Sequence, residues 1–494
     1  MTLDAPVPRI RDPDPNIRVL VLEWRPMRFL LLAGAIALPC SAQQAVADLA
    51  DLVLADVRVF DSRTKEVSEP VDVVVRGPRI AAIGPAGSAP DARRTIAGHG
   101  RLLVPGLVDT HVHLHQILRT DEDSLPQSIG AEGSRDRATV ADWFLPHGTT
   151  AIVDMGMPES WLATAVEWQR APAADLPLLR LTGSALISDL EWDRHPAAHH
   201  VVVADPAAAR AKVREYAGLG LQHVKLYWKL LAPEFEAAAV AAKEQGLIAA
   251  AHVDNGLYSM DAALAHGVRH FEHFFTLVPS ILDTRRHGPA LEREFGIGRA
   301  QNIDELAARF VLFFAYVKQR PELEARLLAQ MDRLAAADAS LSTAIHVVGA
   351  AAGATTLFSS FDPLPERDAP QLRGWDDEQR RRLRAAFDTM MGFVRAAHER
   401  GVRLRIGTDC REGGRAVLSE LRLLCEAGFE TADVLQIATW NGADAMGLCA
   451  EVGVVEVGRR ASMILWQDDP LADPAHLQGD KIVIHEGVVL GEPR

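Results

Sequence analysis

Residues 106–113 carry two histidines, His111 and His113, one residue apart at the end of an apolar run. In a β-strand, residues i and i+2 point to the same side, so these two imidazoles can share one cation. Further apolar runs end in residues of ligand type, which are Lys225, His252, His273 and Asp409. Gathered in one pocket, these side chains would bind two divalent cations and activate water.

Imidazoles and carboxylates suit borderline and hard divalent ions, and the pattern indicates no thiolate ligand. A lone pair of histidines at this spacing would be weak evidence, because strand histidines are often held by structural hydrogen bonds. Ligand-type residues at the ends of five separate strands are much stronger evidence. The sequence therefore predicts a metal site assembled from several strand ends.

The elements that must position these residues are eight apolar, strand-like runs that alternate with helical patterns. The runs are 102–113, 149–156, 176–187, 223–228, 247–253, 268–275, 341–349 and 402–409. Helices are expected at 206–220, 233–246 and 259–267. This alternation indicates βαβ units and an α/β fold with a parallel sheet. Eight units predict a (β/α)8 TIM barrel, whose active site lies at the carboxyl ends of the strands, where the ligand-type residues fall.

Both ends of the chain carry short β-branched runs with turn residues between them, at about 51–83 and again at 452–466 and 481–490. They predict a small β-sandwich domain built from both chain termini, with the catalytic domain inserted between its halves. The predicted limits are 43–104 and 451–494 for the two parts of the sandwich and 105–450 for the barrel.

Two connections in the predicted barrel are too long for plain crossovers, near 279–340 and 350–401. The first contains an amphipathic helical stretch at 304–337, and the second begins with a loop rich in Ser, Pro and Gly. By the barrel rule both lie on the active-site face, so they form a lid that shapes substrate choice or a contact in a homo-oligomer. The sequence favours neither.

The composition bounds the class of protein. The chain has 494 residues, 48% of them hydrophobic, and a net charge of −14. It is long enough for one large catalytic domain with an accessory layer. No basic stripe of the kind that binds phosphates is present, so we expect a small-molecule substrate and no nucleic-acid partner.

Residues 27–42 combine a basic start, an apolar core too short to span a bilayer, and small residues at the end. They predict an export signal within 1–42, with Met27 as an alternative start of translation. The mature protein would be periplasmic or secreted, without stable membrane insertion. The alternative is an amphipathic segment of a cytoplasmic protein. Only Cys410, Cys425 and Cys449 would remain, too few for disulfides to supply the main stability. Cys410 either lines the pocket or fills the core.

On these motifs the chain resembles the amidohydrolase superfamily of metal-dependent hydrolases, over nearly all of its length after the signal. The resemblance implies that His111 and His113 bind the more buried metal, and that His252 and His273 bind the second. It implies that Lys225 is carboxylated and bridges the two, and that Asp409 ligates the buried metal and handles the proton. Zinc is the expected metal, with Mn, Co or Fe as alternatives. A simple salt bridge at Lys225 and a single metal ion form the other interpretation.

Three further residues are candidates for substrate binding. Tyr227 shares the strand parity of Lys225 and is placed to polarise a carbonyl, His346 falls at the end of the seventh predicted strand, and Arg411 is suited to a substrate carboxylate. Packing for His346 and a surface ion pair for Arg411 are the structural alternatives. His115 is expected in a supporting or structural role. His195, His199 and His200 form either a rim of the site or a solvated cluster.

The function expected from these residues is hydrolysis of an amide or related C–N bond by metal-activated hydroxide. Dipeptides, N-acyl amino acids and cyclic amides are the expected substrates. The fragments 224–228 and 250–255 most resemble the group of imidazolonepropionase-like proteins and Xaa-Pro dipeptidases. The alternatives are an esterase or lactonase on the same scaffold, or a non-catalytic member that only binds a ligand.

Overall fold

The computed structural model describes residues 49–118, 133–193, 196–254, 256–354 and 372–490. The predicted export signal within 1–42 lies outside the described residues. So does most of the loop predicted at the start of the second long connection. Along the part of the chain that is described, no helix is both long enough and apolar enough to cross a bilayer.

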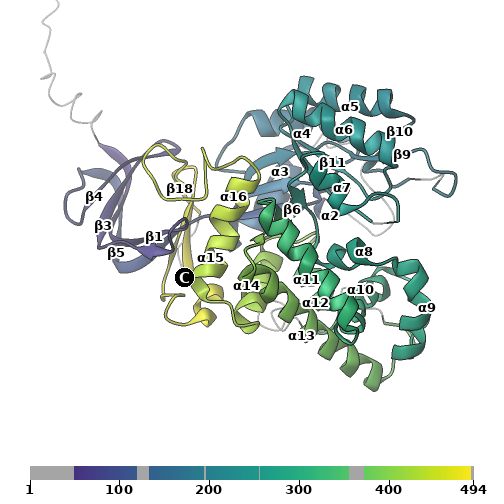
Figure 1. The fold of residues 1–494 in the computed structure, drawn as a ribbon. Coiled ribbons are helices and arrows are strands. Elements are labelled where there is room, and N and C mark those ends of the chain that lie inside the picture. The colour runs from purple at the N-terminus through teal and green to yellow at the C-terminus, as the bar shows by residue number, and fades with distance from the viewer. Residues whose placement is uncertain (1–48, 119–132, 194–195, 255, 355–371, 491–494) are drawn as a thin grey trace, which may run out of the picture. The chain divides into compact units, whose positions relative to one another are not determined.

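Both ends of the described chain join in one eight-stranded sheet (Figure 1). Its order is β18-β17-β16-β5-β1-β3-β4, with β2 paired to β1. The strands are β1 (Ala50–Asp61), β2 (Glu66–Val67), β3 (Val71–Arg76), β4 (Arg79–Pro85), β5 (Ala92–Pro105), β16 (Met463–Trp466), β17 (Lys481–His485) and β18 (Val488–Val489). Residues Met463 and Pro105 pair where β16 runs antiparallel to β5. The layer predicted from both termini is therefore a single sheet here, and the described strands of these segments form no second sheet facing it.

The segment predicted to form the barrel consists of parallel strands in two sheets. The first has the order β6-β7-β8, with β6 (Leu107–Val112), β7 (Thr149–Asp154) and β8 (Leu178–Leu181). The second has the order β10-β9-β11-β12-β13-β14-β15, with β9 (Ala185–Ser188), β10 (His200–Val203), β11 (His223–Leu226), β12 (Ile248–Ala251), β13 (His270–Phe271), β14 (Ser340–Ser342) and β15 (Arg403–Arg405). The predicted α/β class with a parallel sheet is confirmed. A closed barrel with one continuous ladder is not seen.

Backbone hydrogen bonds nevertheless link the two sheets at one seam. The Thr110 amide donates to the Ile406 carbonyl at 2.9 Å, and the Asp409 amide donates to the His111 carbonyl at 2.8 Å. These bonds join β6 to the segment that follows β15. They bring the first and last ligand-bearing segments of the chain side by side.

The other seam arises because the third predicted strand, 176–187, is two strands. It breaks between β8 and β9 at Gly183, whose φ of +75° lies in the left-handed region. A Cβ at this position would come within 2.6 Å of the Tyr216 ring. Tyr216 is fully buried, and its hydroxyl accepts the Ser184 amide proton at 3.0 Å. The kink therefore divides the strand between the two sheets.

Gly183→Ala should lower the free energy of unfolding by about 2–5 kcal/mol. The left-handed backbone contributes about 1–2 kcal/mol of this loss, and the clash with the ring contributes about 1–3 kcal/mol. Urea unfolding measures the change. Gly246→Ala is the matched control, because Gly246 has a similar φ of +69° but nothing within 4 Å of an added Cβ. Equal losses in the two variants would show that the Tyr216 contact is unimportant.

The helices expected before Lys225, His252 and His273 are present as α5 (Pro206–Gly218), α6 (Ala232–Gln245) and α7 (Met260–Ala265). Asp205 caps α5 by accepting the Ala208 amide proton, and Pro206 occupies the first turn. The other helices with apolar faces toward the core are α4 (Leu162–Arg170), α10 (Ile303–Lys318), α11 (Pro321–Ala336), α13 (Asp377–Glu399) and α14 (Gly414–Glu426). The described chain also has the short helices α2 (Leu114–Ile117), α8 (Leu277–Ile281), α15 (Thr431–Gln436) and α16 (Gly442–Ala445). Two longer helices are α3 (Gly133–Phe144) and α9 (Thr284–Phe295).

The first long connection, predicted to hold one amphipathic helical stretch at 304–337, contains two helices, α10 and α11. They are separated at Pro321, which starts α11 because proline fits a first helical turn but not a helix interior. The seventh predicted strand, 341–349, is also shorter than expected. It ends at Ser342, and Ala344 has a φ of +44°, which turns the chain into α12 (Ile345–Ala351). His346 therefore lies in a helix and not at the end of a strand.

Candidate metal centre

The two histidines of the opening motif lie at the end of β6 with their Nε2 atoms 3.4 Å apart. His111 Nδ1 donates to a carboxylate oxygen of Glu272 at 2.7 Å, and His113 Nδ1 donates to the Gly156 carbonyl at 3.0 Å. Both partners can only accept, so each Nδ1 carries the proton. In the neutral form of each imidazole, Nε2 is then left with a lone pair, which is the state a metal ligand needs.

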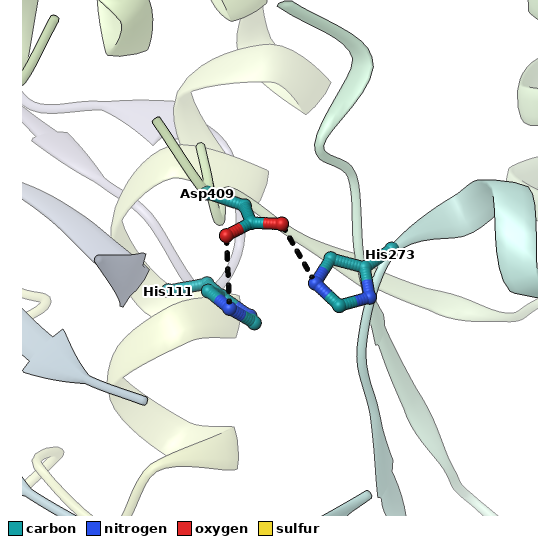
Figure 2. Close-up of side chains that lie close together, drawn as sticks. All are labelled: His111, His273 and Asp409. Atoms are coloured by element: carbon teal, nitrogen blue, oxygen red, sulfur yellow. Dashed lines mark ion pairs between the residues drawn. The ribbon is translucent and has the colours of Figure 1, made fainter. Parts of the chain in front are cut away.

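Asp409 and His273 complete the group (Figure 2). His273 Nε2 is 3.0 Å from Asp409 Oδ2, and Asp409 Oδ1 is 3.3 Å from His113 Nε2 and 3.5 Å from His111 Nε2. Ligand atoms of His111, His273 and Asp409 all lie within 4.8 Å of one another. A carboxylate facing imidazole nitrogens at these distances is a donor set that a divalent ion accepts.

Asp409 and His273 both adopt left-handed backbone, with φ of +50° and +62°. Left-handed backbone is uncommon for any residue other than glycine and costs conformational free energy, and strain of this kind clusters at functional sites. The His273 amide donates to Ser342 Oγ at 2.8 Å, and the Asp409 amide is held by His111. These bonds fix the two turns that aim the side chains at one point.

Several buried polar atoms at the centre have no hydrogen-bond partner, namely Lys225 Nζ, His252 Nδ1 and His273 Nδ1. Buried polar atoms are nearly always paired, so unpaired ones need an explanation. Imidazole nitrogens ordinarily act as metal ligands, and a lysine amine is the precursor of a carbamate ligand. Unpaired atoms of these two kinds therefore fit a site for divalent cations. The residues present therefore fit the group that the sequence predicts.

Burial sets the protonation of these groups. It lowers the pKa of His111 to about 3, so the imidazole is neutral at physiological pH. Burial also lowers the pKa of Lys225 to about 8, against the opposing influence of the Glu272 and Asp409 charges. Lys225 is 2% exposed, at the end of β11. Part of the Lys225 population therefore carries an uncharged amine near pH 7.

The structure brings four of the six predicted ligands, His111, His113, His273 and Asp409, to within 3.5 Å of a partner in the group. His252 follows β12, and its ring lies 4.9 Å from that of His273. Lys225 and His252 stand outside the tightest group of donor atoms. Both side chains line the same centre, which is consistent with a second ion. Their roles as ligands remain predictions.

A fully buried ion pair between Arg405 and Glu272 lies next to the histidines of the centre. Arg405 Nη2 donates to Glu272 Oε1 at 2.6 Å, and both side chains have no exposed surface. Arg405 Nη1 also donates to Thr110 Oγ1 at 2.5 Å. This network orients the His111 ring. Arg405 was not predicted, although a charged residue within the apolar run 402–409 is a signal that the sequence offers.

Glu272→Gln should destabilise the protein by about 3–5 kcal/mol, because it leaves the buried Arg405 guanidinium without a counter-charge. It should also weaken metal binding by about 10- to 100-fold, since a partner that orients a ligand is lost. Urea unfolding and a chelator competition measure the two effects. Asp175→Asn removes the exposed partner of Arg137 and serves as the control, with a cost below about 1 kcal/mol. An unchanged metal affinity in Glu272→Gln would contradict the orienting role.

The backbone of the histidine motif is held by a second carboxylate. Asp109 accepts from Thr408 Oγ1 at 2.7 Å and from the His111 and Thr408 amides at 3.1 Å each. Complete burial raises the pKa of Asp109 to about 6 despite these bonds. Asp109 thus ties β6 to the segment that ends in Asp409.

The three candidate substrate residues have different surroundings. The Tyr227 ring packs against His252 at 5.2 Å, so it faces the centre, and burial raises its pKa to about 12, which keeps the phenol a hydrogen-bond donor. Arg411 makes an ion pair of 3.8 Å with Glu412. His346 was expected at a strand end but lies in α12, where its Nδ1 is 2.8 Å from Ser419 Oγ.

Two further histidines pack beside the motif. His115 and His199 stack with ring centroids 4.5 Å apart, and their rings lie 5.1 and 5.6 Å from that of His113. His200 joins His199 to Tyr227, with ring separations of 4.3 and 4.7 Å. The described members of the cluster after the third predicted strand therefore line the centre, while His195 lies outside the described residues.

Comparison with known proteins agrees with this architecture. A sequence model of the amidohydrolase family matches residues 102–492. An adenine deaminase of Deinococcus radiodurans is 39% identical over 103 residues, which cover 21% of this chain and 16% of that protein. The chain thus aligns with only about a sixth of the length of the first curated relatives it matches.

Two solved structures share the fold over most of the chain. A Xaa-Pro dipeptidase with bound methionine superposes with a TM-score of 0.59 at 19% identity, covering 90% of this chain and 100% of that one. A prolidase described as putative, from Bifidobacterium longum, gives a TM-score of 0.61 at 21% identity, covering 90% of this chain and 97% of that one.

Proposed function

Because the chain belongs to the amidohydrolase family, we propose that it hydrolyses the C–N bond of a small amide substrate with the aid of two divalent cations. The observation that carries this proposal is the convergence of three imidazole Nε2 atoms on the Asp409 carboxylate within 3.0–3.5 Å. His111, His113 and Asp409 would hold one ion. His252 and His273 would hold the other, with Lys225 between them.

Bound divalent cations supply Lewis acidity, which makes water a stronger acid and polarises the scissile carbonyl. The Asp409 carboxylate takes the proton of the attacking water and later delivers it to the leaving nitrogen. The Tyr227 hydroxyl, facing the centre beside His252, donates a hydrogen bond to the carbonyl oxygen as negative charge develops there. The products are a carboxylic acid and an amine.

As the neutral amine, Lys225 would add carbon dioxide and release one proton to solvent, and the carbamate so formed would supply two anionic oxygens as metal ligands. Its pKa of about 8, lowered by burial, and its unpartnered Nζ support this proposal. A plain ammonium would place a third positive charge beside two cations, which is unfavourable in a buried site. Zinc is the expected metal, and Mn, Co or Fe are the alternatives.

Lys225→Met should reduce the metal content from two ions to one or fewer per chain, because a thioether of similar length cannot form a carbamate. Turnover should fall by at least about 10²-fold, in line with losing a group that positions a catalytic ion. Elemental analysis and kinetics on the same preparation check both outcomes. Two bound ions in the variant would remove the bridging role.

The substrate class is tested with a panel. The panel contains amides, which are dipeptides with and without a proline at the second position, N-acyl amino acids and cyclic amides. It also contains matched esters and lactones. Adenine is added because part of the chain is similar to adenine deaminases. The variant Asp409→Asn serves as the blank for contaminating hydrolases. We expect release of an amine from one of the amide classes.

Turnover of esters alone would replace this proposal by an esterase or lactonase. Ammonia release from adenine alone would favour a deaminase. No turnover of any class by protein loaded with zinc would overturn the catalytic proposal and favour a ligand-binding member.

We also propose export to the periplasm or secretion, on the basis of the basic and apolar pattern of residues 27–42. Cell fractionation of the full chain, with detection at its C-terminus, would show the protein outside the cytoplasm. Its retention in the cytoplasm at full length would overturn this assignment.

A further inference from the structure

A second group of ligand-type side chains lies beside the proposed metal centre and takes no part in it. His346 on α12 meets Cys410 and Glu412, which belong to the segment between β15 and α14. One donor atom from each of the three lies within 4.8 Å of the others. His346 and Cys410 are 1% and 6% exposed, and Glu412 is half-buried.

The His346 ring is oriented from the opposite side by α14. Its Nδ1 is 2.8 Å from Ser419 Oγ, and its backbone amide donates to Glu420 Oε1 at 2.7 Å. A histidine that binds a metal characteristically donates its other ring N–H to an oxygen, which fixes the tautomer and the ring plane. In the tautomer in which Ser419 Oγ accepts from Nδ1, Nε2 is the nitrogen that presents a lone pair.

The three donors form a recognised combination. An imidazole, a thiolate and a carboxylate together bind Zn²⁺, whose bonds to these groups are about 2.0–2.3 Å long. Ligands at those distances from one ion must lie within roughly 4.5 Å of each other, so small side-chain rotations bring this group into place. A thiolate selects zinc-like ions over Mg²⁺ and Ca²⁺, and the Cys410 proton is released to solvent on binding.

We propose that His346, Cys410 and Glu412 bind one further transition-metal ion, of the zinc type, at a site separate from the centre built on His111 and Asp409. Cys410 directly follows Asp409 in the chain, so an ion held there anchors the segment that carries Asp409 to α12. The site thereby supports the strained backbone at Asp409, with its φ of +50°, without contacting the substrate.

The ligand set allows a spectroscopic test that is independent of activity. Co²⁺ bound to a thiolate absorbs intensely in the near ultraviolet through charge transfer from sulfur, whereas imidazole and carboxylate ligands give no such band. The centre on His111 and Asp409 includes no sulfur among its proposed ligands. Titration of the full-length apoprotein with Co²⁺ should therefore produce this band with an amplitude of one equivalent per chain.

Cys410→Ser should abolish the band, and Cys425→Ser and Cys449→Ser should keep it, as matched controls at the other two described cysteines. Glu412→Gln should keep the band but require at least about tenfold more Co²⁺. A circular dichroism spectrum shows whether each variant is folded. Absence of the band in the wild-type protein, or its survival in Cys410→Ser, would overturn the proposal.

A second measurement uses the wild-type protein alone. Zn²⁺ should slow alkylation of Cys410 by iodoacetamide at least tenfold, as followed by peptide mass mapping of each cysteine under mildly denaturing conditions. Mg²⁺ should give no protection. Equal alkylation of Cys410 with and without Zn²⁺ would contradict the site even if Cys410→Ser fails to fold.

Discussion

Asp409→Asn is expected to keep the bound metal and to lose turnover by about 10²- to 10⁴-fold, the usual contribution of a positioned acid or base. Asparagine preserves the shape of the side chain and one oxygen that can face the histidines. Its amide cannot take a proton from water at neutral pH, so neither the attack on the carbonyl nor the release of the amine is assisted. Kinetics and elemental analysis on one preparation separate these two effects.

The matched control for this prediction is Asp254→Asn. Asp254 lies two residues after His252, and its carboxylate accepts the Gly256 amide proton at 2.8 Å. Its turnover should stay close to that of the wild-type protein. If Asp409→Asn kept both its metal and its turnover, Asp409 would have no part in proton transfer, and another group would have to be found.

The sequence predicted the ligand-bearing segments because each of them obeys a simple periodicity. His111 and His113 share one side of a strand, and Lys225, His252, His273 and Asp409 close apolar runs. In parallel strands these ends meet at one edge. In the structure, His111, His113, His273 and Asp409 lie together, with contacts of 3.0–3.5 Å between their side chains.

Backbone breaks were not predictable from the same periodicity. Gly183 interrupts a run that otherwise has the composition of one strand, and the break depends on Tyr216, which comes from α5 far along the chain. Ala344 turns the seventh run into a helix with a φ of +44°, a conformation that alanine seldom adopts. Tertiary contacts decide the backbone conformation at both positions. The pattern of apolar residues around them therefore did not predict the two breaks.

Buried charge pairs escaped prediction for a related reason. Glu272 and Arg405 belong to strands β13 and β15 or their ends, which are separated by more than a hundred residues. Neither residue alone shows that the other will neutralise it at 2.6 Å. A charge inside an apolar run is a reason to search for a partner, but the partner is identified only when the strands are placed in order.

His111→Ala is expected to lose metal and activity together, in contrast to Asp409→Asn. The imidazole is one of only two from β6, and its Nε2 lies 3.4 Å from His113 Nε2 and 3.5 Å from Asp409 Oδ1. Alanine provides no ligand atom, and it also removes the shorter of the two hydrogen bonds that Glu272 Oε2 accepts, at 2.7 Å. We expect at most one ion per chain and a loss of turnover of at least about 10³-fold, since the lost ion takes its Lewis acidity with it.

His115→Ala is the control for His111→Ala, because His115 is another buried histidine close by in the chain, in α2, and its ring lies in the same cluster. Its ring stacks on His199 and not on Asp409 or His273, so the variant should retain two ions and most of its turnover. Thermal unfolding of both variants without metal shows whether any difference comes from folding. If His111→Ala bound as much metal as His115→Ala, the histidine pair at the end of β6 would not be the anchor of the centre.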